Sequence, residues 1–381
     1  MAKIRPVAII LASAGFLFGA QPAAAAGDVV AEEIRTQYEL IRVVRVAGGL
    51  EHPWAVAFLP DGRYLVTERP GRLNVVAGGA ATPVSGLPQI HAHRQGGLLD
   101  VVLHPDFAEN GWVYLTYSKG DADGTALALG RGRLDGTRLV GFEELWVQDR
   151  VSEAGRHYGS RLAWLSDGTL VMSVGDRGAE PPRAQDLRDH AGKLLRLNAD
   201  GSVPADNPFV GRDDAHPEIY SLGHRNIQGL VVVPGTDAIW STEHGERGGD
   251  ELNLHQAGEN YGWPIITRSR HYRSEEQYGE ARSREGYVDP VYEFLPTLAP
   301  SGLALVTHDR FPSWRGNLLA GGLGAERIRR VVLEDGAVVH EEELLFGLVG
   351  RIRDVREGPD GHIYILSDES DGGLYRLESA R

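Results

Sequence analysis

Four polar side chains stand together in the stretch SLGHRNIQGL: His224, Arg225, Asn226 and Gln228. The apolar run GLVVVPG follows directly and predicts a buried strand. An arginine and an asparagine at the start of such a strand need hydrogen-bonding partners. The stretch therefore predicts that Arg225 and Asn226 hold an anionic ligand with several hydrogen-bond acceptors.

Further polar residues stand at the ends of other apolar segments. They are Gln95, His157, Arg161, Asp176, Arg177, Thr297, Ser301, Arg351 and Arg353. Arg351 and Arg353 are two residues apart and so share one face of a strand. Singly, each residue has an ordinary structural explanation, such as a satisfied core histidine or a pair of surface arginines. Together at one end of a fold, they predict a positively charged pocket that suits carboxylates or phosphates.

The elements that would bring these residues together repeat along the chain. Six segments share an apolar strand, a turn (in several, PDG or SDG) and a second strand rich in β-branched or aromatic residues. They begin at Trp54, Leu98, Arg161, Ile227, Ser301 and Arg351. Each window holds about four strands, which predicts an all-β fold, a six-bladed β-propeller. A β-sandwich or barrel is the alternative, and six recurrences favour the propeller.

One domain is predicted over residues 27–381. The segment YELIRVVRVA, residues 38–47, is expected to pair with the last blade and close the ring, which removes an exposed sheet edge. Helical periodicity is almost absent, and residues 180–197 predict only a short turn before a strand. In a propeller, the residues that precede the innermost strands meet over the central channel.

The first 26 residues predict a secretory signal peptide. Lys3 and Arg5 precede an apolar stretch, Val7 to Ala20, that is too short to span a bilayer comfortably, and small residues follow it. A membrane anchor is the less favoured alternative, and no later segment is long and apolar enough to span a membrane. The mature protein is therefore expected to be periplasmic or secreted.

Composition excludes several classes of function. The formal net charge of −14 becomes about −16 when the first 26 residues are removed, which disfavours binding to nucleic acid or to anionic membranes. The chain has no cysteine, which rules out disulfides, thiolate zinc sites, catalytic cysteines and iron–sulfur clusters.

Several motifs resemble a known family. They are RQGGLLDVVLHPDF, RHYGSRLAWLSDGTLVMSVGDRG, AQDLRDHAGKLLRLNADG, GHRNIQGL, EHGERGGDELNLHQAGENYGWP, PTLAPSG and GRIRDVREGPDG. From about Leu50 to its end, the chain is similar to the soluble aldose sugar dehydrogenases that depend on pyrroloquinoline quinone (PQQ), the glucose/sorbosone dehydrogenase family. The resemblance implies a six-bladed propeller, an aldose substrate, an external electron acceptor, and a monomer or homodimer.

The resemblance also implies roles for individual residues. PQQ is a flat ortho-quinone with three carboxylates, and the family pattern assigns its binding to Gln95, Arg225, Asn226, Thr297, Arg351 and Arg353. His157 matches the general base, which takes a proton from a sugar hydroxyl as hydride leaves the same carbon. Arg225 would stabilise charge on the quinone oxygen. Asp176 is expected to orient His157 or the substrate.

Calcium is the second cofactor that the resemblance implies. The cofactor calcium of the family corresponds to a loop in which Gly245 and Glu246 are the expected ligands, largely through backbone carbonyls. A structural calcium corresponds to Glu251 and Tyr261. The ion beside the cofactor would enhance the electrophilicity of the quinone.

Two positions depart from the family pattern and leave the sugar open. Gly324 stands where relatives commonly carry a cofactor-binding lysine, for which Arg327 is a possible substitute, and Leu295 stands where some carry a tryptophan near the substrate. A calcium-dependent lactonase-type hydrolase that uses Glu243, Asn226 and Asp176 is one alternative, although the arginines oppose it because cations repel a metal. A non-catalytic propeller that binds a glycan or a protein is the other.

Overall fold

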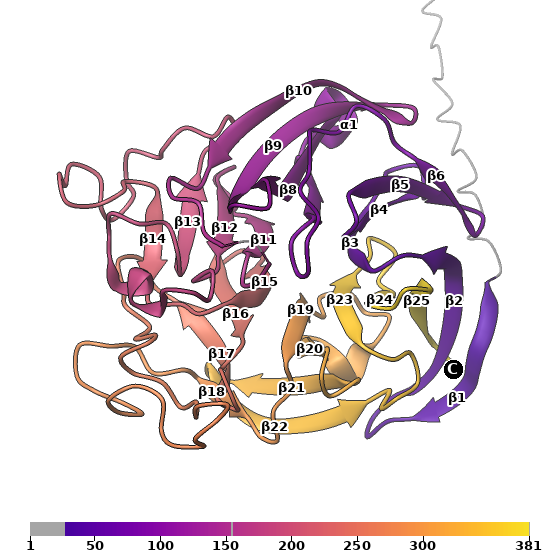
Figure 1. The fold of residues 1–381 in the computed structure, drawn as a ribbon. Coiled ribbons are helices and arrows are strands. Elements are labelled where there is room, and N and C mark those ends of the chain that lie inside the picture. The colour runs from indigo at the N-terminus through magenta and orange to yellow at the C-terminus, as the bar shows by residue number, and fades with distance from the viewer. Residues whose placement is uncertain (1–26, 154, 381) are drawn as a thin grey trace, which may run out of the picture.

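The computed structural model describes residues 27–153 and 155–380, which form six antiparallel sheets arranged around a common axis (Figure 1). The prediction of an all-β, six-bladed propeller is confirmed. The predicted signal peptide lies outside the described residues. Within the described part of the chain, no helix is both long enough and apolar enough to cross a membrane.

The first three blades follow in chain order. Blade one contains β3 (Pro53–Phe58), β4 (Tyr64–Glu68), β5 (Arg72–Ala77) and β6 (Ala80–Pro83). Blade two contains β7 (Leu98–Leu103), the one-turn helix α1 (Phe107–Asn110), β8 (Trp112–Gly120), β9 (Thr125–Asp135) and β10 (Arg138–Val147). Blade three contains β11 (Gly159–Trp164), β12 (Leu170–Val174), the 3₁₀ turn η1 (Pro181–Gln185), β13 (Lys193–Leu197) and β14 (Ile219–Leu222). The turn η1 and strand β13 agree with the prediction for residues 180–197.

The last three blades complete the ring. Blade four contains β15 (Ile227–Val233), β16 (Ala238–Glu243), β17 (Asp250–His255) and β18 (Tyr292–Phe294). Blade five contains β19 (Pro300–Leu305), the 3₁₀ turn η2 (Pro312–Trp314), β20 (Leu318–Gly322), β21 (Ile328–Glu334) and β22 (Ala337–Leu344). Blade six contains β23 (Ile352–Glu357), β24 (Ile363–Ser367), β25 (Gly372–Ser379), β2 (Leu40–Leu50) and β1 (Asp28–Arg35).

Blade six joins the two ends of the described chain. Strand β2 pairs antiparallel with β25 from Ile41 opposite Ser379 to Leu50 opposite Gly372, and β1 covers the outer edge of β2. The predicted pairing of the N-terminal strand with the last blade is therefore confirmed. Because both ends of the chain share one sheet, opening the ring would require an eleven-residue strand to separate from β25.

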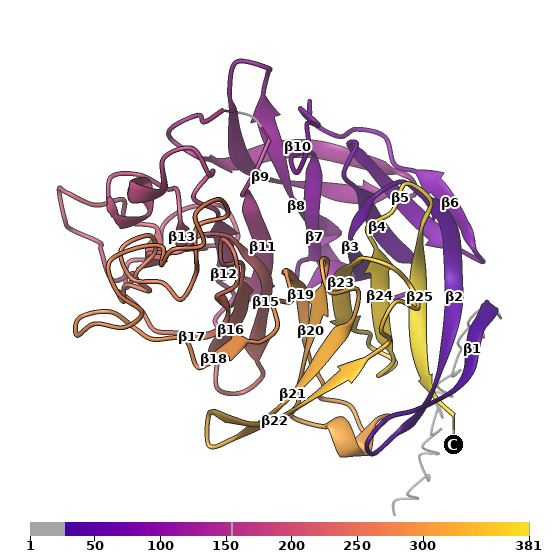
Figure 2. The same ribbon diagram turned by 60° about the horizontal axis from the view of Figure 1, so that its bottom comes forward.

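The first strand of each blade lies nearest the axis. These innermost strands, β3, β7, β11, β15, β19 and β23, contact one another in ring order (Figures 1 and 2). Apolar side chains from neighbouring blades fill the space between the sheets, and Leu115, Leu129 and Leu170 are almost fully buried there. Truncating one such leucine to alanine costs about 2–5 kcal/mol. The packed sheets thus hold the ends of the innermost strands in fixed positions.

Every innermost strand has an irregularity in its pairing at the same end. The register to the second strand shifts within the first few residues of all six, for example between Pro53 and Ala55 in β3 and between Ile352 and Asp354 in β23. A bulge re-aims the side chains beside it. One end of the axis is therefore surrounded by side chains that the regular sheet does not direct.

Candidate active site

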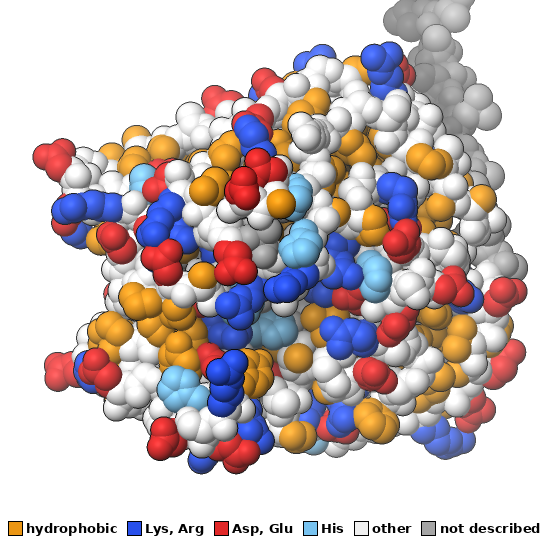
Figure 3. Space-filling view, viewed as in Figure 1, with side chains coloured by type: hydrophobic (Ala, Val, Ile, Leu, Met, Phe, Trp, Pro, Cys, Tyr) orange, Lys and Arg blue, Asp and Glu red, His pale blue; other side chains and the backbone are white. Residues whose placement is uncertain are grey.

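Basic side chains and histidines gather around the middle of one face of the ring (Figure 3). A cavity of about 380 Å³ is lined by residues at the bulged ends of the innermost strands and by adjoining loops. All six blades contribute to its wall, which includes His52, Trp54, Arg69, Gln95, Tyr158, Ser160, Asn226, Gln228, His244, Ala299, Gly324, Arg351, Arg353, Asp368 and Glu369. The structure thus collects residues that lie up to about three hundred positions apart in the sequence.

The wall of this cavity contains more guanidinium groups than carboxylates that pair with them. Arg353 donates to Gln228 Oε1 over 2.9 Å and to Asp368 Oδ2 over 3.2 Å, and Arg69 lies 3.7 Å from the other oxygen of Asp368. The Arg351 guanidinium donates to the carbonyl of Leu323 at 3.3 Å, and the Arg351 backbone N–H donates to Glu369 Oε1, also at 3.3 Å. Among the described residues, Asp368 is the only carboxylate of the wall that pairs with a guanidinium.

The pKa shifts agree with this surplus of positive charge. Burial raises the pKa of Asp368, but Arg353 and Arg69 outweigh it and hold that pKa below its usual range. Burial also lowers the pKa of Arg69, opposed by Asp368 and reinforced by Arg353 and Arg351. A ligand with several carboxylates would relieve the repulsion among the three arginines.

His157 stands beside this cavity in a defined orientation. Its Nδ1 lies 2.7 Å from Asp176 Oδ1, and the Trp263 indole donates to Asp176 Oδ2 over 2.8 Å. The His157 backbone N–H donates to Gln95 Oε1 over 2.8 Å. Asp176 therefore holds the proton on Nδ1 and leaves Nε2 with a lone pair. Of the two partners considered for Asp176, His157 and the substrate, His157 is the one that it contacts in the structure.

Electrostatics favour the neutral form of His157. Burial lowers its pKa below the ordinary value of 6.5, and the attraction of Asp176 opposes this only in part. The positive charge of Arg225 lowers the pKa further. The imidazole is therefore unprotonated at neutral pH, which is the state that a general base requires.

Strained backbone marks the loops around this cavity. Arg94, His157, Ser160 and Ala299 have φ values of 52°, 51°, 80° and 49°, a region that side chains with a Cβ rarely occupy. Each such residue costs about 1–3 kcal/mol, and such residues concentrate at functional sites. The strain at His157 accompanies the placement of its ring against Asp176.

A second, much smaller cavity of about 10 Å³ adjoins the first, and His244 lines both. Arg225, Glu243, Gly245, Glu251 and Tyr261 contribute to its wall. This volume is about the space that one water molecule or ion needs. Both Arg225 Nε and His244 Nε2 are buried without a hydrogen-bond partner. Buried polar atoms without a partner are uncommon and mark positions where a ligand can bind.

Two buried carboxylates face each other at the small cavity. Glu243 and Glu251 are direct cross-strand partners on β16 and β17. The pKa of each is raised to about 8, mainly by burial, and the charge of Glu243 contributes to the rise at Glu251. Like charges opposite each other on a sheet are destabilising unless a proton or a cation lies between them. The pair is therefore suited to a hard cation.

The structure separates the predicted site residues into three groups. Gln95, Asn226, Arg351 and Arg353 line the large cavity. Arg225, Gly245, Glu251 and Tyr261 line the small one. His157 lies beside the first group through its hydrogen bond to Gln95.

Thr297 and Glu246 form the third group, and they line neither cavity. The Thr297 hydroxyl donates to Asp250, which also accepts the backbone N–H groups of Leu298 and Ala299 at 2.8 Å. Glu246 accepts a bond from the backbone of Tyr272 at 3.4 Å, and its own N–H donates to Ser269. Their predicted roles remain predictions.

The sequence analysis missed several residues of the wall. Arg69 and His52 belong to blade one, for which no polar residue was proposed, and His244 lies between two residues that were considered. Arg69 follows the second strand of its blade, whereas most of the residues predicted from the sequence precede the first strand of theirs. The turn ERPG after β4 was the available signal. Arg327, the suggested substitute for a lysine, instead pairs with Glu343 at 2.6 Å.

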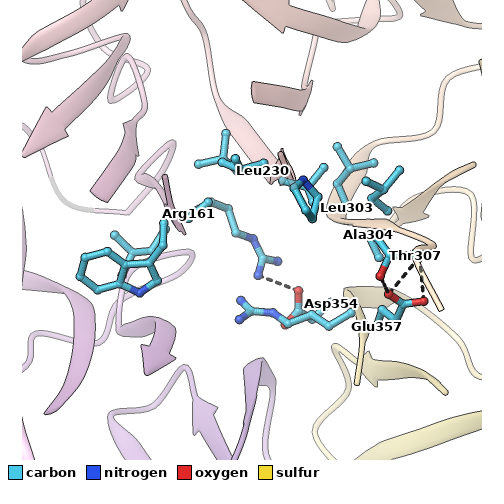
Figure 4. Close-up of a pocket in the computed structure, with 15 residues that line it drawn as sticks. Arg161, Leu230, Leu303, Ala304, Thr307, Asp354 and Glu357 are labelled. Atoms are coloured by element: carbon cyan, nitrogen blue, oxygen red, sulfur yellow. Dashed lines mark hydrogen bonds and ion pairs between the residues drawn. The ribbon is translucent and has the colours of Figure 1, made fainter. Parts of the chain in front are cut away.

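A third cavity, of about 310 Å³, lies at the opposite ends of the innermost strands (Figure 4). Its two arginines are paired: Arg161 Nη1 lies 2.7 Å from Asp354 Oδ1, and Arg356 Nε lies 2.9 Å from Asp354 Oδ2. Arg161 also donates to the carbonyls of Gln228 and Arg353. Arg161, a candidate from the sequence, is thus fully engaged inside the protein.

The fold and the site define a six-bladed propeller with a cation-lined ligand cavity on one face and a histidine–aspartate pair beside it. Residues 50–376 match the glucose/sorbosone dehydrogenase family. The chain belongs to that family, which confirms the resemblance and the predicted class of sugar-oxidising enzyme.

Individual relatives agree with this assignment. Aldose sugar dehydrogenase YliI of Escherichia coli is 41% identical over 337 residues, which cover 86% of this chain and 90% of the relative. The apo form of the soluble aldose sugar dehydrogenase from Escherichia coli superposes with a TM-score of 0.85 at 39% identity, covering 89% of this chain and 99% of that one. The PQQ-bound aldose sugar dehydrogenase from Streptomyces coelicolor superposes with a TM-score of 0.73 at 27% identity, covering 89% and 98%.

Proposed function

We propose that this protein oxidises an aldose with PQQ and calcium as cofactors and passes the electrons to an external acceptor. The observation that carries the proposal is the neutral His157, held by Asp176, next to a cavity in which guanidinium groups exceed ion-paired carboxylates. The family membership supplies the reaction class, and the PQQ-bound relative supports the identity of the cofactor.

The donors in the large cavity fit a flat molecule with three carboxylates. Arg69, Arg351 and Arg353 supply guanidinium groups, and Gln95 and Asn226 supply amides. Gly324, at the position of the family's cofactor-binding lysine, brings no positive charge to the wall, whereas Arg69 does. When bound, PQQ would supply an electrophilic quinone that accepts hydride from the sugar.

His157 would act as the general base toward the sugar hydroxyl. Its Nε2 carries the lone pair, because the Nδ1 proton is directed to Asp176. As the proton moves to Nε2, the Asp176 carboxylate stabilises the resulting imidazolium. Asp176 is well suited to this role, since it accepts bonds from Trp263 and from the Gly178 N–H, which lies 2.8 Å away.

Arg225 would hold negative charge next to the base. Its guanidinium lies over the Trp263 ring at 5.3 Å, and its Nε has no partner among the described residues. It would therefore stabilise an anionic oxygen in the site while it keeps His157 neutral. The two effects support the same proton transfer.

Calcium is proposed at the small cavity, with Glu251 and Tyr261 as predicted and Glu243 in addition. Calcium prefers oxygen ligands, and a dication between Glu243 and Glu251 would remove their repulsion. Gly245 lines the same cavity, and a Cβ there would lie 1.9 Å from the carbonyl oxygen of Gly248. The backbone carbonyl oxygens of Gly245 and Glu246 remain the proposed ligands for the calcium ion beside the cofactor.

The hydrolase alternative is less well supported. Two of its three proposed metal ligands are already engaged: Asp176 with His157, and Asn226 with the N–H of Gly159 at 3.0 Å. A non-catalytic binding propeller would have no use for a neutral histidine oriented by a buried aspartate. The predicted signal peptide further supports a periplasmic or secreted enzyme.

The first experiment is reconstitution of the purified protein with PQQ and calcium, followed by dye reduction with a panel of aldoses. We expect reduction that requires PQQ, calcium and a sugar together. PQQ binding is measured separately by fluorescence titration. Absence of PQQ binding would contradict the cofactor assignment, and binding without turnover on any aldose would contradict the substrate class.

A further inference from the structure

Two histidines and an aspartate from three separate segments converge at the boundary of blades two and three. Asp149 follows β10, His190 precedes β13, and His216 lies in the loop before β14. His190 Nδ1 lies 2.8 Å from Asp149 Oδ1, and His216 Nε2 lies 2.9 Å from Asp149 Oδ2. One donor atom from each residue falls within 4.8 Å of the others. None of the three lines either cavity of the candidate active site.

A fourth residue orients one of the histidines from behind. Glu218 Oε1 lies 2.8 Å from His190 Nε2 and also accepts a bond from the Trp146 indole at 3.2 Å. A proton on Nε2 leaves a lone pair on Nδ1, which accepts the backbone N–H of Asp149 over 3.1 Å and would exchange this bond for one to a metal ion. A carboxylate behind a histidine in this way is typical of metal-ligating histidines, because it fixes the tautomer and raises the basicity of the ring.

The cluster offers oxygen as well as nitrogen donors. The backbone carbonyl of Arg188 lies 3.0 Å from His216 Nε2, the same ring nitrogen that contacts Asp149. A tetrahedral metal ion with bonds of about 2.0–2.2 Å places neighbouring ligand atoms about 3.4 Å apart. The two separations between Asp149 and the histidines, 2.8 and 2.9 Å, are near this spacing, and the three donor atoms all lie within 4.8 Å of one another.

The local charge favours a cation. Asp149 and Glu218 bring two carboxylates to two imidazoles, and the nearby arginines have their own partners. Arg150 pairs with Glu180 at 2.8 Å, and Arg183 pairs with Asp189 at 2.6 Å.

We propose that Asp149, His190 and His216 bind a first-row transition-metal dication such as zinc, at a structural site separate from the sugar site. Imidazole with carboxylate is a donor set that suits zinc, copper and nickel, whereas calcium prefers oxygen alone. The ion joins the end of β10 to the two loops that flank β13. It therefore fastens blade two to blade three on the outside of the ring.

The test is calorimetric titration of zinc into the PQQ-free protein, with calcium in excess to fill carboxylate sites. We expect one equivalent to bind the wild type and binding to be lost in His216→Ala. Glu218→Gln is expected to weaken binding about tenfold, as for other groups that orient a metal ligand. His362→Ala is the matched control, because His362 pairs with a carboxylate, Asp360, at 2.8 Å but belongs to no cluster of three ligating side chains among the described residues.

Cobalt supplies an independent readout through its visible absorption when histidines ligate it. The expected band appears with wild type and with His362→Ala and is absent with His216→Ala. Two results would overturn the proposal: no zinc bound by the folded wild type, or equal binding by wild type and His216→Ala. The first would mean that Asp149 holds the two histidines by hydrogen bonds alone. Neither result depends on PQQ or on turnover.

Discussion

The two ends of the propeller axis both carry arginines, but in opposite electrostatic states. At one end, Arg161 and Arg356 share Asp354 and Asp100, so that two guanidinium groups meet two carboxylates. At the other end, three guanidinium groups line a cavity in which only Asp368 pairs with them, as described above. Arginines are thus fully paired with carboxylates at one end of the axis and only partly paired at the other, where they can bind an anion.

The difference shows that charge balance, more than arginine content, separates structural arginines from ligand-binding ones. A buried and fully paired arginine holds the fold together, because removal of either partner leaves an uncompensated charge. An arginine with partial pairing at a cavity retains free donors for a ligand. Substitutions at the two ends should therefore change different quantities.

The largest effect is expected from His157→Ala at the cavity end. Loss of the general base should lower kcat about 10²–10⁴-fold, while PQQ still binds because the arginines are unchanged. Steady-state dye reduction and a PQQ fluorescence titration measure the two quantities. Turnover close to that of the wild type would contradict the role of His157.

At the paired end, Asp354→Ala should affect stability instead. It leaves Arg161 without its nearest carboxylate, and the free energy of unfolding should fall by about 3–5 kcal/mol. Chemical denaturation measures this change. The folded fraction should bind PQQ as the wild type does, and weaker PQQ binding with unchanged stability would break the comparison between the two ends.

Calcium removal should destabilise the protein, and more so at higher pH. In the calcium-free protein, Glu243 and Glu251 have pKa values of about 8, above the ordinary 4.5, so their protons favour the folded state and are lost as the pH rises. Calcium at about 100 times its Kd would add about 2.7 kcal/mol. Thermal unfolding with and without a chelator should show a larger gain at pH 8 than at pH 6, and an equal gain would argue against this pair as ligands.

Arg69→Gln should weaken PQQ binding about tenfold, which corresponds to about 1.4 kcal/mol. The free energy of unfolding should change little, because Arg69 is only partly paired, at 3.7 Å from Asp368. Arg63→Gln is the matched control: Arg63 lies at another turn of the same blade and pairs with Asp61 at 2.7 Å. Equal PQQ affinity in the two variants would remove Arg69 from the site.

The smallest effect concerns the pH profile of the wild type. Because burial depresses the pKa of His157, kcat/KM should rise with pH through an apparent pKa below 6.5 and level off by neutral pH. A profile that is flat at acid pH, or one that rises only above neutrality, would be inconsistent with this histidine as the base. Asp176→Asn should alter the profile while PQQ affinity is retained.

Much of the architecture could be predicted because each blade begins with a recognisable strand–turn–strand pattern in the local sequence. The six predicted starting residues fall within two residues of the first residues of β3, β7, β11, β15, β19 and β23. Gln95, Asn226, Arg351 and Arg353 followed from that regularity, since residues at equivalent strand ends meet over the axis. Arg69 did not, because it stands at a different turn of its blade.

The sequence by itself determined the number of blades, the closure by residues 38–47 and some of the polar residues at one end of the axis. These features depend on local alternation and on turn residues, which are short-range signals. Only the tertiary structure decided which arginines are paired. Arg161 meets Asp354 across 193 residues, and the Thr297 hydroxyl meets Asp250 across 47. Charge balance depends on such distant neighbours, and no local pattern encodes them.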